Sequence, residues 1–260
     1  MLSEFTTLNG VDLSTLNIYV VRLESGLPTA PFLPSQEIIE DYAMNNDVPY
    51  YFGTKKNPLE LDVVFAKING YWTWDERREF ARLLTPDNDD YMEFYYHEDD
   101  EPVKVYYVKY TGGIDIASTS NREGYITVHF RCDSPYSYSQ VYTRIDDLSA
   151  ITEPTLLSPT FVNNGDDYLY PELWIEKVDN GDIKIKNLTN AGKELVITDL
   201  IDGEIVYVNN EDGSIESSLS DTYRLNDHNG VYIELVRGTN TLQVTGKCKL
   251  TWKYKYRIKG

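Results

Sequence analysis

Residues Phe161–Lys177 read FVNNGDDYLYPELWIEK, and this stretch changes from a polar turn to a new β-strand. Its first half is a cluster of residue types that form turns: Asn163, Asn164, Gly165, Asp166 and Asp167. In the second half, Leu173 and Ile175 alternate with more polar neighbours, which is the pattern of a half-buried strand. Pro171 stands at the first strand position, where proline is tolerated. The stretch therefore predicts that one β module ends and a second begins here.

Short β-rich runs separated by Asn-Gly and Asp-Gly pairs extend this pattern along the chain, which is typical of sandwiches and barrels. The runs are Leu59–Phe65, Tyr91–Tyr96, Val103–Tyr110, Tyr125–Arg131, Ile183–Lys186, Leu195–Ile197, Ile205–Val208, Val231–Val236 and Leu250–Ile258. The length of 260 residues exceeds that of one ordinary domain of roughly 100 to 150 residues. The sequence therefore predicts a mainly β chain with two β-sandwich domains, 1–140 and 141–260. Residues 140–159 show no strand pattern, so we expect the hinge there.

One helix is expected over Trp74–Leu84. Thr73 and Glu76 have the spacing of a capping box, and Pro86 ends the helical pattern. The apolar side chains of the segment form one stripe, which predicts that the helix packs against a sheet of the N-terminal domain.

The proline-rich segment 24–58 shows little periodicity, and we expect a long irregular arm or loop that either carries a function or wraps a partner. Within it, Ser35 is a suitable N-cap for a short helix over Gln36–Met44.

Charge narrows the function classes. The net charge of −18 disfavours specific binding to nucleic acid, because that contact needs clustered Lys and Arg. The last twenty residues are the exception, since they carry six bases and no acid. From Lys249 to Lys259 most of these bases alternate with apolar residues, so this end is either a docking surface for an acidic neighbour or the solvated face of one strand. The 22 tyrosines suit β surfaces and partly wet protein interfaces.

No catalytic, metal or cofactor site is expected. The two cysteines, Cys132 and Cys248, exclude a disulfide framework, and without a CxxC pair the three histidines do not make a four-ligand zinc motif. His129 and Cys132 lie at an odd separation in one strand, so their side chains point to opposite faces. GxSxG, GxxxxGK and GxGxxG motifs are all missing, so the chain is not expected to be an enzyme. No signal peptide or membrane span is visible, which predicts synthesis in the cytoplasm.

Residues 87–101 contain eight acidic residues and no Lys or Arg, and they end in the tip HEDDEP, 97–102. The tip is either a solvated hairpin turn or a surface that repels DNA from a channel. A calcium loop is excluded, because the spacing of oxygen ligands around a glycine is missing.

Several motifs together resemble the distal tail protein family of long-tailed bacteriophages. FTTLNGVDLSTLNIYVVRLE resembles the opening of the family, and WTWDERREFARLLTP followed by YMEFYYHEDD resembles its helix and hairpin. ITVHFRCDSPYSYS, 126–139, resembles the close of the first domain, and RGTNTLQVTG, 237–246, precedes the last strand. The order and spacing of the motifs span nearly the whole chain.

The resemblance implies a virion protein at the distal end of the tail. In this family the N-terminal domain builds a hexameric ring that joins the tail tube protein to a tail-tip or tail-associated lysin protein. The C-terminal domain is galectin-like and carries receptor-binding or baseplate proteins. The lectin motifs His-x-Asn-x-Arg and Trp-x-x-Glu-x-Arg do not occur in 141–260, so docking is expected there rather than sugar binding.

Two sets of residues are candidates within such a ring. The aromatic residues Tyr71, Trp72 and Trp74 beside the helix are either interface or core residues. The acidic residues Glu98, Asp99, Asp100 and Glu101 are candidates for a lumen-facing tip, and unchanged DNA ejection after their charge reversal would contradict that role. The alternative functions are a carbohydrate-binding or adhesin module and an enzyme that degrades cell-wall polysaccharide.

Overall fold

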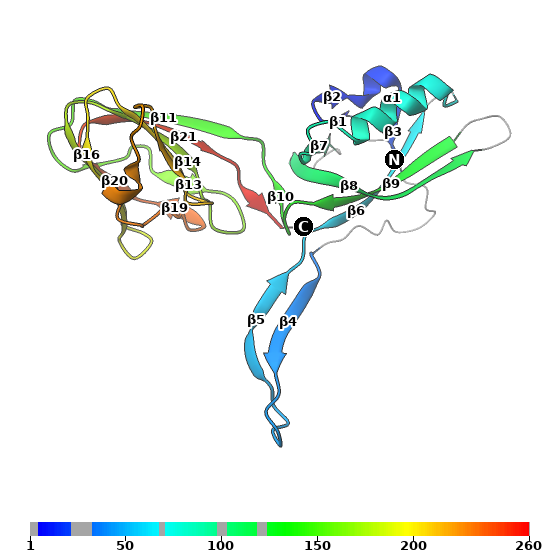
Figure 1. The fold of residues 1–260 in the computed structure, drawn as a ribbon, viewed down its shortest axis with the longest axis horizontal. Helices are drawn as coiled ribbons and strands as arrows, with labels where there is room; N and C mark the ends of the chain where they lie inside the picture. The colour runs from blue at the N-terminus through cyan, green and yellow to red at the C-terminus, as the bar shows by residue number, and fades with distance from the viewer. Residues whose placement is uncertain (1–4, 22–32, 68–70, 98–102, 119–123, 260) are drawn as a thin grey trace. The chain divides into compact units, whose positions relative to one another are not determined.

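The structure, a computed structural model, describes residues 5–21, 33–67, 71–97, 103–118 and 124–259 (Figure 1). The chain divides into two compact units, an N-terminal unit of Met1–Tyr138 with Lys259–Gly260 and a C-terminal unit of Ser139–Ile258. The mainly β class expected from the alternating pattern is confirmed. The one α-helix among these residues, α1 (Trp74–Leu84), spans the predicted range.

The N-terminal unit contains an antiparallel sheet in which seven strands follow the order β2-β1-β7-β8-β9-β6-β3, and β10 pairs with β8 off this path. Its elements are β1 (Phe5–Leu8), β2 (Val11–Asp12), the 3₁₀ helix η1 (Leu13–Leu16), β3 (Ile18–Val20), β4 (Gln36–Asp41), β5 (Tyr50–Lys56), β6 (Glu60–Lys67), α1, β7 (Met92–His97), β8 (Lys104–Ser118), β9 (Gly124–Cys132) and β10 (Ser137–Tyr138). Helix α1 packs on the sheet because its apolar stripe, including Phe80 and Leu84, joins the core formed by Phe65, Phe94 and Phe130.

The C-terminal unit is a β-sandwich. Its elements are β11 (Tyr142–Leu148), β12 (Thr155–Leu156), β13 (Phe161–Asn163), β14 (Glu172–Lys177), β15 (Gly181–Asn187), β16 (Lys193–Leu200), β17 (Ile205–Asn209), β18 (Ile215–Ser217), the 3₁₀ helix η2 (Arg224–Asp227), β19 (Gly238–Asn240), β20 (Leu242–Thr245), β21 (Cys248–Tyr254) and β22 (Arg257–Ile258). A five-stranded sheet, β11-β21-β14-β17-β18, and a four-stranded sheet, β12-β20-β15-β16, contribute buried side chains to one core. Leu173 and Ile175 of the opening stretch belong to it, as their alternation predicts.

The prediction that residues 140–159 lack strands is wrong. Strand β11 lies there and pairs with β21 over seven residues, from Tyr142 to Leu148. The sequence hides this strand because its inward positions are partly polar. Arg144 and Asp146 form an ion pair at 2.9 Å, and the Trp252 indole donates to Asp146 at 2.9 Å. Paired polar groups here take the place of the apolar side chains that mark a buried strand face.

The predicted strand over Val231–Val236 is also wrong, since only Leu235 forms an isolated bridge, with Leu169. Three buried asparagine side chains bind the backbone of this segment instead. Asn210 accepts from the Ile233 amide at 2.7 Å, Asn240 accepts from the Val236 amide at 3.0 Å, and Asn187 donates to the Glu234 carbonyl at 2.9 Å. Buried backbone groups need partners, and side chains meet that need here without a neighbouring strand.

The expected helix over Gln36–Met44 is a strand in the structure. Residues Gln36–Asp41 form β4, which pairs antiparallel with β5 in a long hairpin (Figure 1). Ile38 and Ile39 are adjacent β-branched residues, which favour extended backbone over helix. The Ser35 carbonyl accepts from the Asn57 amide at 2.9 Å, so this residue closes the base of the hairpin rather than capping a helix.

Candidate docking and assembly surfaces

The three aromatic residues beside α1 have different environments. Trp72 is a core residue, only 2% exposed, and its indole nitrogen donates to the Gly124 carbonyl at 3.0 Å. Of the two roles predicted for Trp72, interface or core, the structure shows the core, because its ring packs against Phe80 inside the unit. Tyr71 and Trp74 are exposed. The Arg78 guanidinium lies 5.3 Å from the centre of the Trp74 ring, which presents an aromatic and cationic surface to solvent.

The acidic residues Glu98–Glu101 lie outside the described residues, and their lumen-facing role stays a prediction. The neighbouring acidic residue Asp89 forms an ion pair with Lys109 at 2.8 Å on the surface.

The local structure of α1 fixes the exposed Trp74 in place. Thr73 accepts from the Glu76 amide at 3.3 Å, and Glu76 accepts from the Thr73 amide at 2.8 Å, which completes the predicted capping box. Lys67 forms a close ion pair with the Glu76 carboxylate. The hydrogen bond from Lys67 and that from the Thr73 amide lower the pKa of Glu76 to about 2.

The thiols and histidines give no nucleophile among the described residues. Cys132 and Cys248 are buried, and burial raises the pKa of each thiol to about 12. His129 faces Asp62, away from the core that contains Cys132, as the strand spacing predicts. His228 is held inside its turn, where it accepts from the Gly230 amide at 3.2 Å, and burial lowers its pKa. No group of three or more His, Cys, Asp or Glu side chains suited to a metal occurs in the described ranges.

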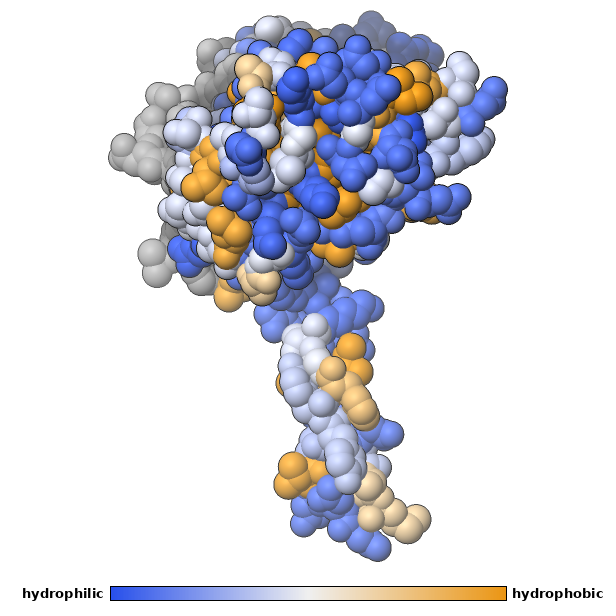
Figure 2. Space-filling view, turned by 90° about the vertical axis from the view of Figure 1, so that its left-hand side faces the viewer, coloured by the Kyte–Doolittle hydropathy of each residue, from blue (hydrophilic) through white to orange (hydrophobic). Residues whose placement is uncertain are grey.

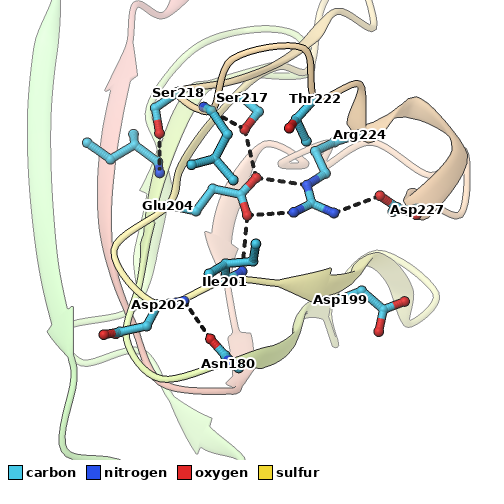
Figure 3. A network of polar contacts seen from close by, with 12 residues as sticks. Asn180, Asp199, Ile201, Asp202, Glu204, Ser217, Ser218, Thr222, Arg224 and Asp227 are labelled. Atoms are coloured by element: carbon cyan, nitrogen blue, oxygen red, sulfur yellow. Dashed lines mark hydrogen bonds and ion pairs between the residues drawn. The ribbon is translucent and has the colours of Figure 1, made fainter.

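A buried polar network holds the segment of β18 and η2 onto the C-terminal unit (Figure 3). Glu204, 1% exposed, accepts two hydrogen bonds from the Arg224 guanidinium at 2.8 and 2.7 Å, one to each carboxylate oxygen. The Ser217 hydroxyl and the Ile201 amide donate to the same carboxylate, and Asp227 accepts from Arg224 at 2.8 Å. This bidentate geometry satisfies both ions and fixes the loop between β18 and Ile233.

Opposing effects set the pKa of Glu204. Burial alone would raise it, but the hydrogen bonds from Arg224, the Ile201 amide and Ser217 outweigh burial and bring it below its ordinary value. The hydrogen bonds to Glu204 in turn raise the pKa of Arg224. Both shifts favour the charged forms of Glu204 and Arg224 at neutral pH. Nothing in the spacing of Glu204 and Arg224 along the chain marks them as partners, so the sequence alone does not predict the network.

The solvent face of the five-stranded sheet is an amphipathic surface, which we call the outer face. One row of cross-strand neighbours crosses it: Ile145, Thr251, Trp174 and Tyr207. The ring centres of Trp174 and Tyr207 lie 4.9 Å apart, and Ile145 is 70% exposed. Charged residues flank the row, including the ion pair of Lys249 and Glu176 at 3.3 Å. An apolar centre with a charged rim is the usual composition of a protein-binding surface.

The predicted alternation of the basic C-terminal end is visible on β21. Leu250 and Trp252 are fully buried, while Lys249 and Lys253 lie on the outer face. Lys249 is paired with Glu176, so part of this basic stretch is a neutralised strand face.

The β4–β5 hairpin is a further exposed surface, in addition to the one formed by Tyr71 and Trp74 and to the outer face. Figure 2 shows apolar side chains distributed along this hairpin. Its only strand pairing among the described residues is within the hairpin itself. None of the helices described in the chain combines the length and hydropathy that a membrane span requires.

Comparison with known proteins accounts for both units. A family model of phage tail protein N-terminal domains matches residues 2–134, and a model of phage tail C-terminal domains matches residues 144–254. The SPbeta prophage-derived uncharacterized protein YomH of Bacillus subtilis (strain 168) is 25% identical over 257 residues, which cover 98% of each chain.

Solved structures show the same fold. The crystal structure of the SPP1 Dit protein, described as a paradigm of the hub adsorption apparatus in phages that infect Gram-positive bacteria, matches with a TM-score of 0.65 at 17% identity. The match covers 98% of this chain and 99% of that one. A chain of the phage P2 baseplate in its activated conformation with Ca matches with a TM-score of 0.57 at 9% identity, over 98% of both chains. The chain thus shares the fold of these two proteins, and the two domain matches together show that it belongs to the phage tail protein family.

Proposed function

We propose that this chain is the distal tail protein of a long-tailed phage, and that six copies form a ring at the end of the tail. The ring would connect the tail tube above to the tail-tip or baseplate proteins below. The observation that carries the proposal is the fold match to the SPP1 hub protein over both units, in a chain of the phage tail family. A structural role also agrees with the buried, high-pKa thiols, which are poor nucleophiles.

The two units have separate roles in this proposal. The N-terminal unit forms the ring, with Tyr71 and Trp74 among its contact residues. The C-terminal unit is a galectin-like sandwich that docks receptor-binding components on its outer face. The row of Ile145, Trp174 and Tyr207 supplies an apolar contact, and the charged residues beside it supply orientation.

Light scattering and negative-stain microscopy of the purified chain test the ring. The expected result is a six-fold particle with six times the chain mass of 30.0 kDa. A chain that stays monomeric at every concentration, alone and with its tail-tube partner, would contradict the proposal.

The alternative of a carbohydrate-binding module rests on the half-buried Trp174 and Tyr207 pair, since aromatic rings that reach the surface also stack on sugars. It predicts glycan binding by a monomer, with affinity lost in Trp174→Ala. Binding of cell-wall polysaccharide that survives this substitution would exclude the outer face as the sugar site.

A further inference from the structure

The β4–β5 hairpin exposes large apolar side chains along its whole length. Every residue of β4 is exposed, and so is every residue of β5 except Gly53. The apolar residues that are exposed between the base and the tip are Ile38, Ile39, Tyr42, Met44, Val48, Tyr50, Tyr51 and Phe52. An apolar surface of this extent marks a contact site, because single scattered apolar residues are normal on proteins but contiguous ones are not.

Both faces of the hairpin carry this apolar surface. The register places Ile38 opposite Thr54 and Tyr51 opposite Glu40 on one face. Ile39 opposite Gly53 and Tyr50 opposite Asp41 lie on the other face. An irregularity beside Ile39 makes Phe52 an extra residue of β5, and its ring is 70% exposed. A partner must therefore contact two faces, which a single flat surface does not do.

The hairpin also lacks the support that a two-stranded ribbon needs. An isolated pair of strands is marginally stable in water, and β4 and β5 pair with no other strand in the described part of the chain. The base, in contrast, is fixed. Lys56 donates to the Tyr136 hydroxyl at 2.7 Å, and Asn57 binds the Ser35 carbonyl. An anchored base with an unsupported apolar stem is the form of an arm that is completed by another molecule.

Charge on the hairpin indicates what that molecule is. Strand β4 carries three acids, Glu37, Glu40 and Asp41, and no base. Strand β5 carries two bases, Lys55 and Lys56, and no acid. Lys55 and Glu37 face each other across the hairpin at 3.9 Å, but their side chains stay 64% and 65% exposed, so both charges remain accessible to a neighbour. Two hairpins related by a two-fold axis through their β4 edges would bring like charges together. Head-to-tail copies instead bring an acidic strand towards a basic one, and such heterologous contacts close into rings.

We propose that the β4–β5 hairpin is the arm by which each copy of this chain binds the next copy. This inference rests on the proposed ring and deepens it by naming the contact. The hairpin lies inside residues 2–134, the part of the chain that matches the phage tail N-terminal domain. Its apolar faces supply the binding energy, and the excess of acid on β4 and of base on β5 sets the direction of the ring.

The double variant I38S/F52S of the full-length chain tests the inference. Both side chains are more than 60% exposed in one copy, so the substitutions leave the fold and its melting temperature unchanged. The expected result in light scattering is loss of the six-copy particle at concentrations where the wild type forms it. The matched control is I145S/Y223S, which removes two side chains of similar exposure from outside the hairpin and keeps the ring.

Photo-crosslinking identifies the neighbour directly. With p-benzoylphenylalanine in place of Phe52, illumination of purified rings should give a covalent product of two chains. Rings that survive I38S/F52S, or that give no two-chain product, would overturn the inference while leaving the ring intact. In assembled tails, a product with a different tail protein and none between copies would overturn it too. A wild-type chain that forms no ring, alone or with the tube protein, would refute the proposed function itself.

Discussion

At the scale of single residues, the pair of Glu204 and Arg224 shows how a buried charge is tolerated. Both side chains are almost fully buried, and every oxygen of the Glu204 carboxylate accepts hydrogen bonds. Removing one partner of such a pair leaves an uncompensated charge inside the protein. The network therefore holds the loop that carries η2 in one conformation.

The Glu204→Gln variant should lower the free energy of unfolding of the C-terminal unit by about 3 kcal/mol, the cost of breaking a buried ion pair. Because the folded pKa of Glu204 is depressed, its contribution is present above the unfolded pKa of 4.5 and is lost as the pH falls through the lower folded value. Urea unfolding between pH 7 and pH 3 measures both effects. Lys247→Ala, which breaks the exposed pair with Asp179, is the control and should leave stability almost unchanged.

At the scale of elements, α1 begins where its own sequence specifies. The Thr73 and Glu76 capping box satisfies two amides that the first helical turn leaves without partners. Lys67 from β6 joins the same carboxylate, so the start of the helix is tied to the sheet. This tie orients Trp74, the first residue of the helix.

Thr73→Ala should reduce the free energy of unfolding of the N-terminal unit by about 1 kcal/mol, through loss of the cap. Glu76 also makes the stability of the N-terminal unit fall as the solution becomes acidic. Its pKa of about 2 lies below the unfolded value of 4.5, so its stabilisation is lost only as the pH falls from 4.5 towards 2. Nuclear magnetic resonance titration of the Glu76 carboxyl group checks the pKa. Thr85→Ala at the other end of the helix is the matched control, and an equal loss there would contradict the cap.

At the scale of the whole molecule, the two units have separate hydrophobic cores with no residue in common. One core surrounds Phe65, Phe80 and Phe94, and the other lies between the two sheets of the C-terminal sandwich. Separate cores suit the proposed hub role, because one unit could be held in a ring while the other binds variable partners.

Phe80→Ala should cost about 3 to 5 kcal/mol, because its ring is buried against Phe65 at 5.1 Å and Trp72 at 5.5 Å. Hydrogen exchange should show the lost protection in the strands of the N-terminal unit alone. Ile185→Ala makes the matching change in the core of the C-terminal unit. It should reduce protection from hydrogen exchange in that unit alone. Equal loss of protection in both units after either substitution would show that they unfold as one.

The sequence by itself determined the features that neighbours along the chain encode. Alternation around Leu173 and Ile175 predicted β14, and the capping box with Pro86 predicted the bounds of α1. These signals are local, because side-chain direction repeats every two residues in a strand and capping involves residues three positions apart.

Only the tertiary structure decided which residues are core and which are surface. Trp72 is buried, whereas Tyr71 and Trp74, which flank it in the sequence, are exposed. All three side chains are aromatic, so residue type alone does not predict which one enters the core. Strand β11 forms only because it pairs with β21, which is far away in the chain. The Glu204–Arg224 ion pair and the pairing of β4 with β5 also join residues that are distant in the sequence. Burial and pairing are set by where distant segments meet. The sequence therefore specified the elements and the class of fold, and the folded chain alone revealed the hairpin whose apolar faces have no partner in the described residues.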